Sequence, residues 1–523
     1  DVKPPAGDVR RTTITALKAG GGSVTLSPAL FQNLIPDRSR VSLSVGPTAK
    51  LNVPVMLAQL DRYPYGCAEQ TTSRAMPLLY ANALSVMAGQ KQDAALKARI
   101  KDAIDRVFAM QDSSGAFGIW GPSDGDLWLT SYVTDFLTRA REAGYEVDAV
   151  KFGQALDRLK NFIAYAQDFK SGGEDRAYAL YVLARNGRAP IGELRYYADT
   201  RLERFGSPLA KAQLGAALAM MGDKERAERA FRAAIAKLGD LSQPASRHDY
   251  GSDLRDGAGL ITLASETRML TDRTASLIDA VATAVQSRAY TSTQEQAWLL
   301  LAAKAISDRA QQTQLTVNGI AHQGQLRRLL SAAEVSTAKL TVTNTGGSPT
   351  DAVVSVVGSS LMTEPAAAHG FKIERTYYTL DGQPVDLASA NGGKATVKQS
   401  QRLVAVLTVT ADAAAGRVLL VDRLPAGFEI ENPRLVSGGD LKALSWLKTT
   451  IDPEHTSFRD DRFVAAFNFF NVNAKKRTAT LAYVVRAVSP GSYVHPAATV
   501  EDMYRPDLHA RTGAGRLIVS AAK

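Results

Sequence analysis

The chain has 523 residues, of which 45% are hydrophobic and 22% are charged, and this composition is typical of soluble globular domains. The formal net charge of +10 is modest for this length, and basic residues alternate with acidic ones apart from short groups such as Lys475-Lys476-Arg477, so we expect no nucleic-acid partner. The longest apolar runs, such as Trp298–Ala303, are much shorter than the ~18 residues of a membrane-spanning helix, so we expect no transmembrane segment.

The first 57 residues alternate β-branched and polar positions, as in Arg11–Leu17 and Val41–Val45, which predicts β-strands. From about residue 58 to 308, apolar residues recur at i, i+3, i+4 and i+7, which is typical of amphipathic helices. We predict helices at Ala95–Met110, Leu127–Ala143, Lys151–Tyr165, Arg176–Arg185, Leu209–Met220, Arg226–Leu238 and Ala275–Gln286. Such a succession of helices without strands predicts stacked helical hairpins that form a solenoid or close into a ring.

The strand pattern returns after about residue 310, as in Gln314–Val317, Ala338–Val342 and Ala352–Val357. It continues from about Phe371 to the end of the chain, for example at Leu403–Val409. We interpret both segments as β-sandwich material.

The only cysteine of the chain lies in the segment Tyr63–Gln70 (YPYGCAEQ), three positions before a glutamine. At the start of a helix, positions i and i+3 share a face, so the Cys67 sulfur can meet the Gln70 carboxamide. Loss of ammonia would then close an internal thioester, which acylates amines and hydroxyls because its thiolate leaving group has a conjugate acid with a pKa of about 8.5. The alternative is that Cys67 only fills space in a core, as lone cysteines often do.

The segment Gly66–Gln70, followed by Thr71–Arg74, resembles the thioester motif of the alpha-2-macroglobulins in the form that their bacterial members carry. Further segments are similar to the same family: Met110–Trp120, Trp128–Val133, Thr291–Gln294 ahead of an apolar helix with Trp298, Arg486–Gly491 and Val500–Pro506. The resemblance therefore extends over nearly the whole chain.

The resemblance implies an all-α α/α toroid inserted in a β-sandwich domain of the CUB type, followed by a C-terminal macroglobulin-like β-sandwich. It places the CUB domain at residues 1–57 and 310–367, the thioester-containing toroid at 58–309 and the terminal β domain at 368–523.

A thioester survives in water only in a dry pocket. The resemblance implies that Tyr63, just ahead of the motif, and Met503, from the terminal β domain, cover the bond, with Tyr65 sharing or replacing the role of Tyr63. Plain core packing is the alternative for Met503. We interpret Glu69 as a helix-start carboxylate and not as a participant in the chemistry.

Some complement relatives use a histidine of the thioester domain as an acyl acceptor. Of the six histidines in this chain, only His248 lies in the helical segment, away from the place expected for that residue. We therefore predict direct aminolysis, with lysine amines preferred over hydroxyls. The histidines show no metal-ligand spacing and the chain has no cysteine pair, so we expect no metal and no cofactor.

The resemblance implies a broad-spectrum endopeptidase inhibitor and not an enzyme. Cleavage of a bait segment outside this chain would release the thioester, which would acylate a lysine of the attacking host or competitor protease once per molecule and so protect the bacterial cell. The resemblance also implies a monomer in the periplasm, part of a lipoprotein that is anchored to a membrane outside this chain. The target proteases and the anchoring membrane do not follow from the sequence.

Three other functions fit part of the pattern. A thioester-bearing surface adhesin would share the chemistry but not the terminal β domain. An α/α-toroid enzyme of the isoprenoid cyclase type would explain the spacing of Gln111, Gly115 and Phe117, yet the chain lacks an Asp-rich cyclase motif. A hydrolase with Cys67 as its nucleophile and a distant histidine as base would not explain Gln70.

Overall fold

A computed structural model describes the chain apart from residues 1–7, 48, 52, 54–55, 57–59, 61–65, 82–94, 242–246, 248, 270–271, 289–290, 307–312, 362–364, 388–394, 413–415, 434–438, 440, 470–476 and 523. The contacts between residues divide it into two compact units. One unit holds residues 10–32 and 39–357, and the other holds residues 358–523 together with residues 1–9 and 33–38.

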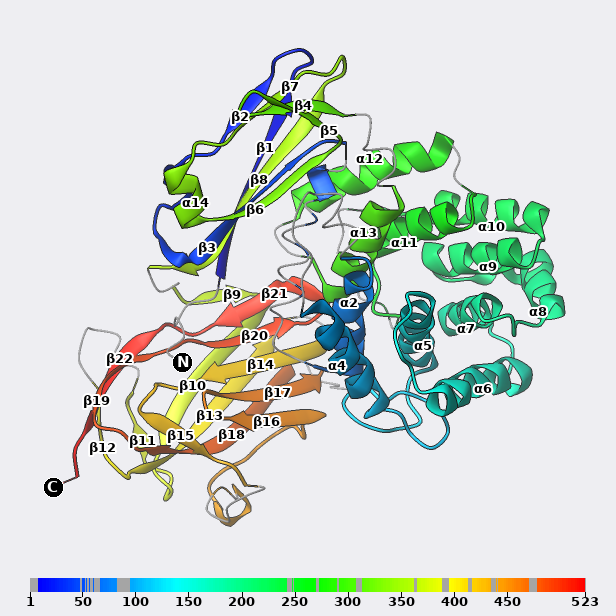
Figure 1. Cartoon of the computed structure of the whole chain (residues 1–523). Helices are drawn as coiled ribbons and strands as arrows, with labels where there is room; N and C mark the ends of the chain where they lie inside the picture. Colours follow the sequence, from blue (N-terminus) through cyan, green and yellow to red (C-terminus); the bar gives the residue numbers. More distant parts are fainter. Residues whose placement is uncertain are drawn as a thin grey trace. The chain divides into compact units, whose positions relative to one another are not determined.

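The helices of the first unit form a closed ring (Figure 1). In the described part, each inner helix packs against the next, and the last packs against the first: α2 (Ala68–Leu78), α5 (Leu127–Glu142), α7 (Glu174–Arg185), α9 (Pro208–Met220), α11 (Asp253–Glu266) and α13 (Thr293–Ala305). Each outer helix lies against inner ones: α4 (Leu96–Phe108), α6 (Ala149–Tyr165), α8 (Ile191–Tyr196), α10 (Lys224–Lys237) and α12 (Asp272–Ser287). This arrangement is an α/α toroid, as predicted.

The residue pattern explains which helices lie inside the ring. Every residue from Trp128 to Ala140 on α5 is buried, so this helix contacts protein on all sides. On α4, by contrast, the buried residues follow the helical repeat, with Leu96, Ile100 and Val107 on one face. The outer helices thus cover the inner ones with a single apolar stripe.

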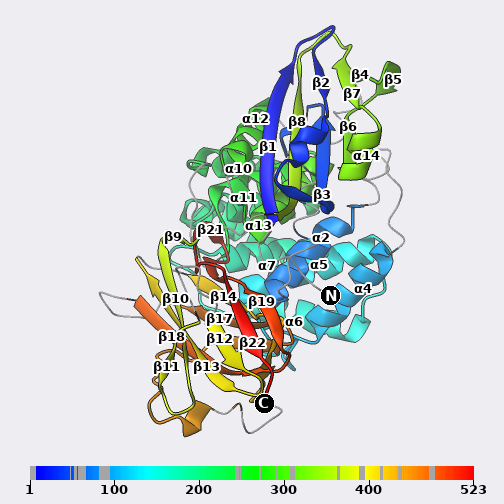
Figure 2. The ribbon, with the colours of Figure 1, turned by 90° about the vertical axis from the view of Figure 1, so that its left-hand side faces the viewer.

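Two four-stranded sheets flank the ring in sequence, and both combine strands from before and after it (Figure 2). The first has the order β1 (Asp8–Leu17), β8 (Thr350–Ser360), β3 (Leu34–Val45) and β6 (Leu326–Ser331). The second has the order β2 (Ser23–Thr25), β7 (Thr341–Asn344), β4 (Gln314–Val317) and β5 (Ile320–Gln323). A short helix, α14 (Ala332–Thr337), follows β6.

The strand register shows how the helical ring is inserted. Val45, at the end of β3, pairs with Leu326, at the start of β6, in an antiparallel ladder. The chain therefore leaves the sheet at β3, builds the ring and later re-enters the same sheet beside its point of exit. The helical ring is an insertion in a β-sandwich, whereas the name CUB and the limits given above for each domain stay predictions.

The second unit is a β-sandwich. Its larger sheets have the orders β11-β10-β13-β18-β15 and β16-β17-β14-β20-β21-β9, and a third sheet has the order β12-β22-β19. The bounds are β9 (Ala367–His369), β10 (Phe371–Tyr378), β11 (Pro384–Val385), β12 (Ala395–Lys398), β13 (Arg402–Ala411), β14 (Arg417–Arg423), β15 (Phe428–Glu431), β16 (His455–Arg459), β17 (Arg462–Asn468), β18 (Arg477–Ala487), β19 (Gly491–His495), β20 (Ala498–Asp502), β21 (Arg505–Arg511) and β22 (Gly515–Ser520).

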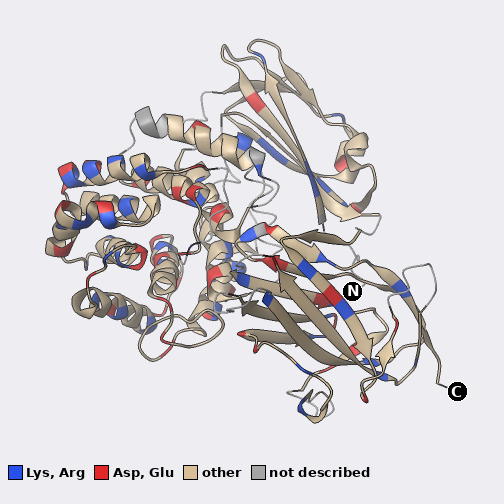
Figure 3. Ribbon diagram, turned by 180° about the vertical axis from the view of Figure 1, so that it is seen from behind, with Lys and Arg blue, Asp and Glu red and all other residues tan. Residues whose placement is uncertain are grey.

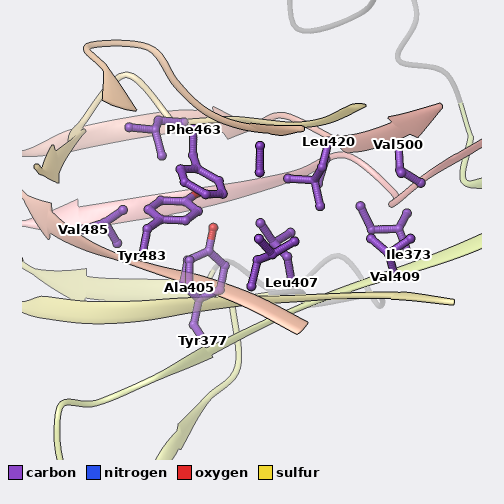
Figure 4. Close-up of a cluster of buried hydrophobic side chains, with 14 of the residues drawn as sticks. Ile373, Tyr377, Ala405, Leu407, Val409, Leu420, Phe463, Tyr483, Val485 and Val500 are labelled. Carbon is purple, nitrogen blue, oxygen red and sulfur yellow. The ribbon is translucent and has the colours of Figure 1, made fainter. Parts of the chain in front are cut away.

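The core of this sandwich is formed by alternate residues of facing strands (Figure 4). Leu407 of β13, Leu420 of β14 and Phe463 of β17 are all buried there. A polar pair also lies in it, since Arg375 forms an ion pair with the fully buried Asp422, which also accepts a 2.7 Å hydrogen bond from the Tyr483 hydroxyl. These bonds satisfy charges that would otherwise be costly to bury.

Basic and acidic residues are interspersed along the helices of the ring (Figure 3). Within the described ranges, no helix is long and apolar enough to cross a membrane.

Candidate functional site

Cys67 and Gln70 lie at the N-terminal end of α2, three positions apart. Cys67 is the N-cap residue, and its Sγ accepts a 3.4 Å hydrogen bond from the backbone N–H of Gln70. Cys67 is fully buried and Gln70 is 1% exposed. The N-cap position holds the sulfur over the first turn, where the backbone N–H groups have no partner within the helix.

The segment Gln111–Trp120 supports the start of α2. The carbonyl of Ile119 accepts a 2.8 Å hydrogen bond from the N–H of Ala68, the residue after the cysteine. A tight loop shapes this segment, because the Asp112 carboxylate accepts hydrogen bonds from the backbone N–H groups of Ser114 and Ala116. The resemblance in this segment thus corresponds to a part of the molecule that positions Cys67.

Glu69 is fully buried and belongs to a polar network between α2 and α13. Its carboxylate accepts hydrogen bonds from the Ser73 hydroxyl at 2.5 Å, the Thr293 hydroxyl at 3.1 Å and the Gln294 amide at 2.9 Å. The Ser73 hydroxyl also bonds to the Tyr132 hydroxyl of α5 at 2.8 Å. Glu69 does lie in the first turn, as we interpreted it, but the structure adds a link between three inner helices.

This network affects the ionisation of Tyr132. Burial of the ring and the neighbouring Glu69 carboxylate both raise the pKa of this phenol, so Tyr132 stays neutral and can donate its proton to Ser73. Hydrogen bonds therefore link these hydroxyl groups, the Glu69 carboxylate and the Nε2 of Gln294, whereas the Oε1 of Gln294 has no partner among the described residues.

A second buried network lies at Arg139 of α5, whose side chain is fully buried. Its guanidinium bonds to Asp135 at 2.9 Å and to Glu266 of α11 at 2.6 Å, and Glu266 also pairs with Arg185 of α7 at 2.9 Å. Burial would raise the pKa of Glu266, but the two arginines lower it to about 2. The ring is thus held by ion pairs between inner helices as well as by apolar packing.

Gly66 and Arg106 of α4 lie against each other, which the sequence did not reveal. A Cβ built on Gly66 would lie 1.9 Å from Nη2 of Arg106, so any other residue here would make the end of the Arg106 side chain move away. The two residues are forty positions apart, and no motif links them.

The predicted covering residues are placed only in part. Met503 lies in the turn between β20 and β21 of the second unit; it is 5% exposed, and its N–H donates to the carbonyl of Arg417 at 3.0 Å. The turn is fixed by Asp502, whose carboxylate accepts from the backbone N–H groups of Tyr504 and Arg505. Tyr63 and Tyr65 fall outside the described residues, so their covering role, like that of Met503, stays a prediction.

The position of His248 also falls outside the described residues. His495 is buried in the second unit and shares a 2.9 Å hydrogen bond with the Tyr377 hydroxyl. Among the residues that the structure describes, no group of three or more His, Cys, Asp or Glu side chains is arranged to hold a metal ion.

Two family models match this chain. The A-macroglobulin TED domain matches residues 39–168, and the bacterial alpha-2-macroglobulin MG10 domain matches residues 370–507. The first match includes the Cys67–Gln70 site, and the second covers most of the second unit.

Known proteins resemble the chain over almost its full length. Alpha-2-macroglobulin of Escherichia coli (strain K12) is 34% identical over 94% of this chain and 30% of the relative, and that of Xylella fastidiosa (strain Temecula1) is 33% identical over 94% of this chain and 31% of the relative. The chain therefore spans about a third of the length of these relatives.

Solved structures share the fold. A crystal structure of native alpha-2-macroglobulin from Escherichia coli, spanning domain MG7 to the C-terminus, has a TM-score of 0.85 and 30% identity, covering 99% of this chain and 83% of that one. Salmonella alpha-2-macroglobulin reacted with methylamine gives a TM-score of 0.83 and 32% identity, covering 99% of this chain and 34% of that one. The chain belongs to the bacterial alpha-2-macroglobulins, a family of protease-trapping inhibitors and not of enzymes, and corresponds to the C-terminal part of its members.

Proposed function

We propose that Cys67 and Gln70 form an internal thioester and that this chain is the reactive part of a broad-spectrum endopeptidase inhibitor. The observation that carries the proposal is the N-cap geometry, in which the Cys67 Sγ lies 3.4 Å from the backbone nitrogen of Gln70 and both residues are buried. Membership of the family supports this proposal and speaks against the cyclase and hydrolase alternatives.

Thioester formation requires attack of the Cys67 sulfur on the Gln70 carboxamide carbon. A C–S bond forms, the C–N bond breaks, and the departing nitrogen takes up the thiol proton to leave as ammonia. Because the two side chains are already held on one helical turn, this step needs little further ordering of the chain. Burial of both residues keeps water away from the product.

We propose that Tyr63, Tyr65 and Met503 cover the bond until a protease cleaves a bait segment elsewhere in the whole protein. The terminal β domain then releases the site, and the thioester acylates a lysine amine of the attacking protease. Each molecule acts once. A Salmonella relative has been crystallised after reaction with methylamine, which supports amine reactivity at such a site.

We also place this activity in the periplasm, on a lipoprotein whose anchor lies outside this chain. Separation of the source cells into periplasmic and membrane fractions, with detection by an antibody to this chain, tests this. Recovery only in the cytoplasm would contradict it.

The decisive experiment on the thioester combines intact mass with a thiol assay on native protein, before and after methylamine. We expect a mass lower than the sequence mass by one ammonia, followed by uptake of one methylamine and release of one thiol. The Cys67→Ala variant is the control, and it should keep the sequence mass and take up no amine.

Other outcomes are equally clear. A thiol that reacts from the start at the unmodified sequence mass would show that no thioester forms, and Cys67 would then be a core residue. A mass higher than that of the thioester by one water would show that the bond had formed and hydrolysed.

The covering role of Met503 has its own test. If this side chain excludes water, the thioester of Met503→Ala should hydrolyse faster than that of wild type. The thioester of Met503→Leu, which keeps the apolar volume, should hydrolyse at nearly the wild-type rate. Equal rates in all three proteins would remove Met503 from the mechanism.

A further inference from the structure

A groove lies between α2 and α4, beside the proposed thioester. It has a volume of about 320 Å³ and is lined by alanines of both helices and by polar side chains: Thr71, Arg74, Arg99, Asp102 and Arg106. A groove of this size accommodates a small organic group.

The groove begins next to the acylating residues. Thr71 directly follows Gln70, and it lies one helical turn after Cys67, which corresponds to about 6 Å along the axis. At the same end, the Arg106 guanidinium fills the space beside Gly66. A molecule that reacts with the thioester from this side therefore places its neighbouring atoms in the groove.

The arginines of the lining favour an anionic ligand. Among the described residues, three arginines and one aspartate line the groove, so guanidinium groups outnumber carboxylates in this lining. Each guanidinium carries five N–H donors in a planar fork that matches a carboxylate, so several of them can serve one anion and other partners at once.

We propose that this groove binds a carboxylate adjacent to the acceptor amine. The inference rests on the proposed thioester and adds a preference to it: the acceptor is a lysine with an acidic side chain close by. The amine nitrogen forms a C–N bond with the Gln70 acyl carbon, the C–S bond breaks, and the amine proton passes to the Cys67 sulfur. The carboxylate keeps its charge throughout and only directs the amine.

The test compares two amines of the same length, one with a charged and one with a neutral group at the far end. ε-Aminocaproate carries a carboxylate, and its primary amide is the neutral analogue. The aminolysis rates of both are measured by thiol release on the full chain, and each is divided by the methylamine rate of the same protein. We expect wild type to favour the carboxylate amine by roughly threefold to tenfold at low salt, as for a partly exposed charge-assisted hydrogen bond.

Three variants of α4 separate the groove from general charge effects. Arg99→Gln should reduce the preference, and Asp102→Asn, which makes the groove more positive, should increase it. Lys101→Gln is the matched control, because this lysine is exposed on the same helix, pairs with Asp105 and does not line the groove. It should leave the preference unchanged.

Equal rates for the two amines in wild type would overturn the proposal, as would equal effects of Arg99→Gln and Lys101→Gln. Reaction with methylamine alone, and with neither longer amine, would show that acceptors do not reach the groove, and would also overturn it. Absence of methylamine uptake would instead refute the thioester itself.

Discussion

Replacement of Glu69 by alanine tests whether this carboxylate holds α2 against α13. Ser73 and Gln294 keep their bond to each other without it, so the Thr293 hydroxyl is the group that loses its carboxylate acceptor outright. A hydrogen bond to a charged group contributes about 1.5–3 kcal/mol, and the smaller losses at Ser73 and Gln294 bring the expected destabilisation to about 2–4 kcal/mol. A simple helix-start carboxylate would contribute only about 0.3–1 kcal/mol through the helix dipole.

Native-state hydrogen exchange of the full chain measures this effect locally, without assuming that the two units unfold together. If the free energy of local opening falls by about 2–4 kcal/mol, the amides of α2 and α13 exchange about 30-fold to 700-fold faster. The same sample, analysed by intact mass, reports the fraction of molecules that have lost ammonia, which we expect to fall as the first turn of α2 loosens.

Glu225→Ala is the matched control, because Glu225 also lies in the first turn of a helix, α10, but is exposed. It should accelerate exchange of its own helix by about fivefold or less. If Glu69→Ala accelerates amide exchange in α2 and α13 by no more than about fivefold, the network does not hold the helices together and the reasoning is refuted.

Gly115→Ala should lower the free energy of unfolding in urea by about 1–3 kcal/mol or more, because Gly115 has φ +88° and an added Cβ would lie 2.3 Å from a backbone carbonyl oxygen. Gly121→Ala is the control and should leave the stability unchanged, because an added Cβ there meets no atom within 4 Å. The pKa of Glu266 is lowered to about 2, so its ionised carboxylate should add about 3 kcal/mol to the free energy of unfolding above pH 4.5, and this contribution should be lost as the pH falls toward 2. Denaturation curves of Glu266→Gln should lack this pH dependence. Burial and a neighbouring arginine lower the pKa of His495 to about 3, so acid should destabilise its unit as pH falls below 6.5, and His495→Gln should flatten that profile.

Much of the fold follows from periodicity. The predicted helices begin within about three residues of the observed ones, as at Leu127 for α5 and Lys151 against Ala149 for α6, because the 3.6-residue repeat survives even where a helix is buried on several sides. The prediction that the helices close into a ring came from the family resemblance and not from the spacing of apolar residues, because a solenoid has the same local pattern. The short helix α14 was not predicted, although Ser331 and Glu334 form a capping box that signals it.

The proximity of Cys67 and Gln70 in the candidate site was predictable, because these two residues are neighbours in sequence. Cys67 and Gln70 share one turn, so their spacing defines their geometry. The partners of Glu69 could not be derived in this way, because Thr293 and Gln294 lie more than two hundred residues away and no local pattern encodes a contact across a ring. The same holds for Arg106, whose fit against Gly66 depends on how α4 packs on α2.

The pairing of β3 with β6 sets the timing of assembly on the ribosome. Val45 and Leu326 are about 280 residues apart, so at 5–20 residues per second the N-terminal strands wait about 15–55 s for their partners. Throughout that interval their backbone N–H and C=O groups offer a template for mispairing with other chains. Val41, Leu43 and Val45 of β3, which are fully buried in the folded chain, are therefore made long before β6, the strand that pairs with them.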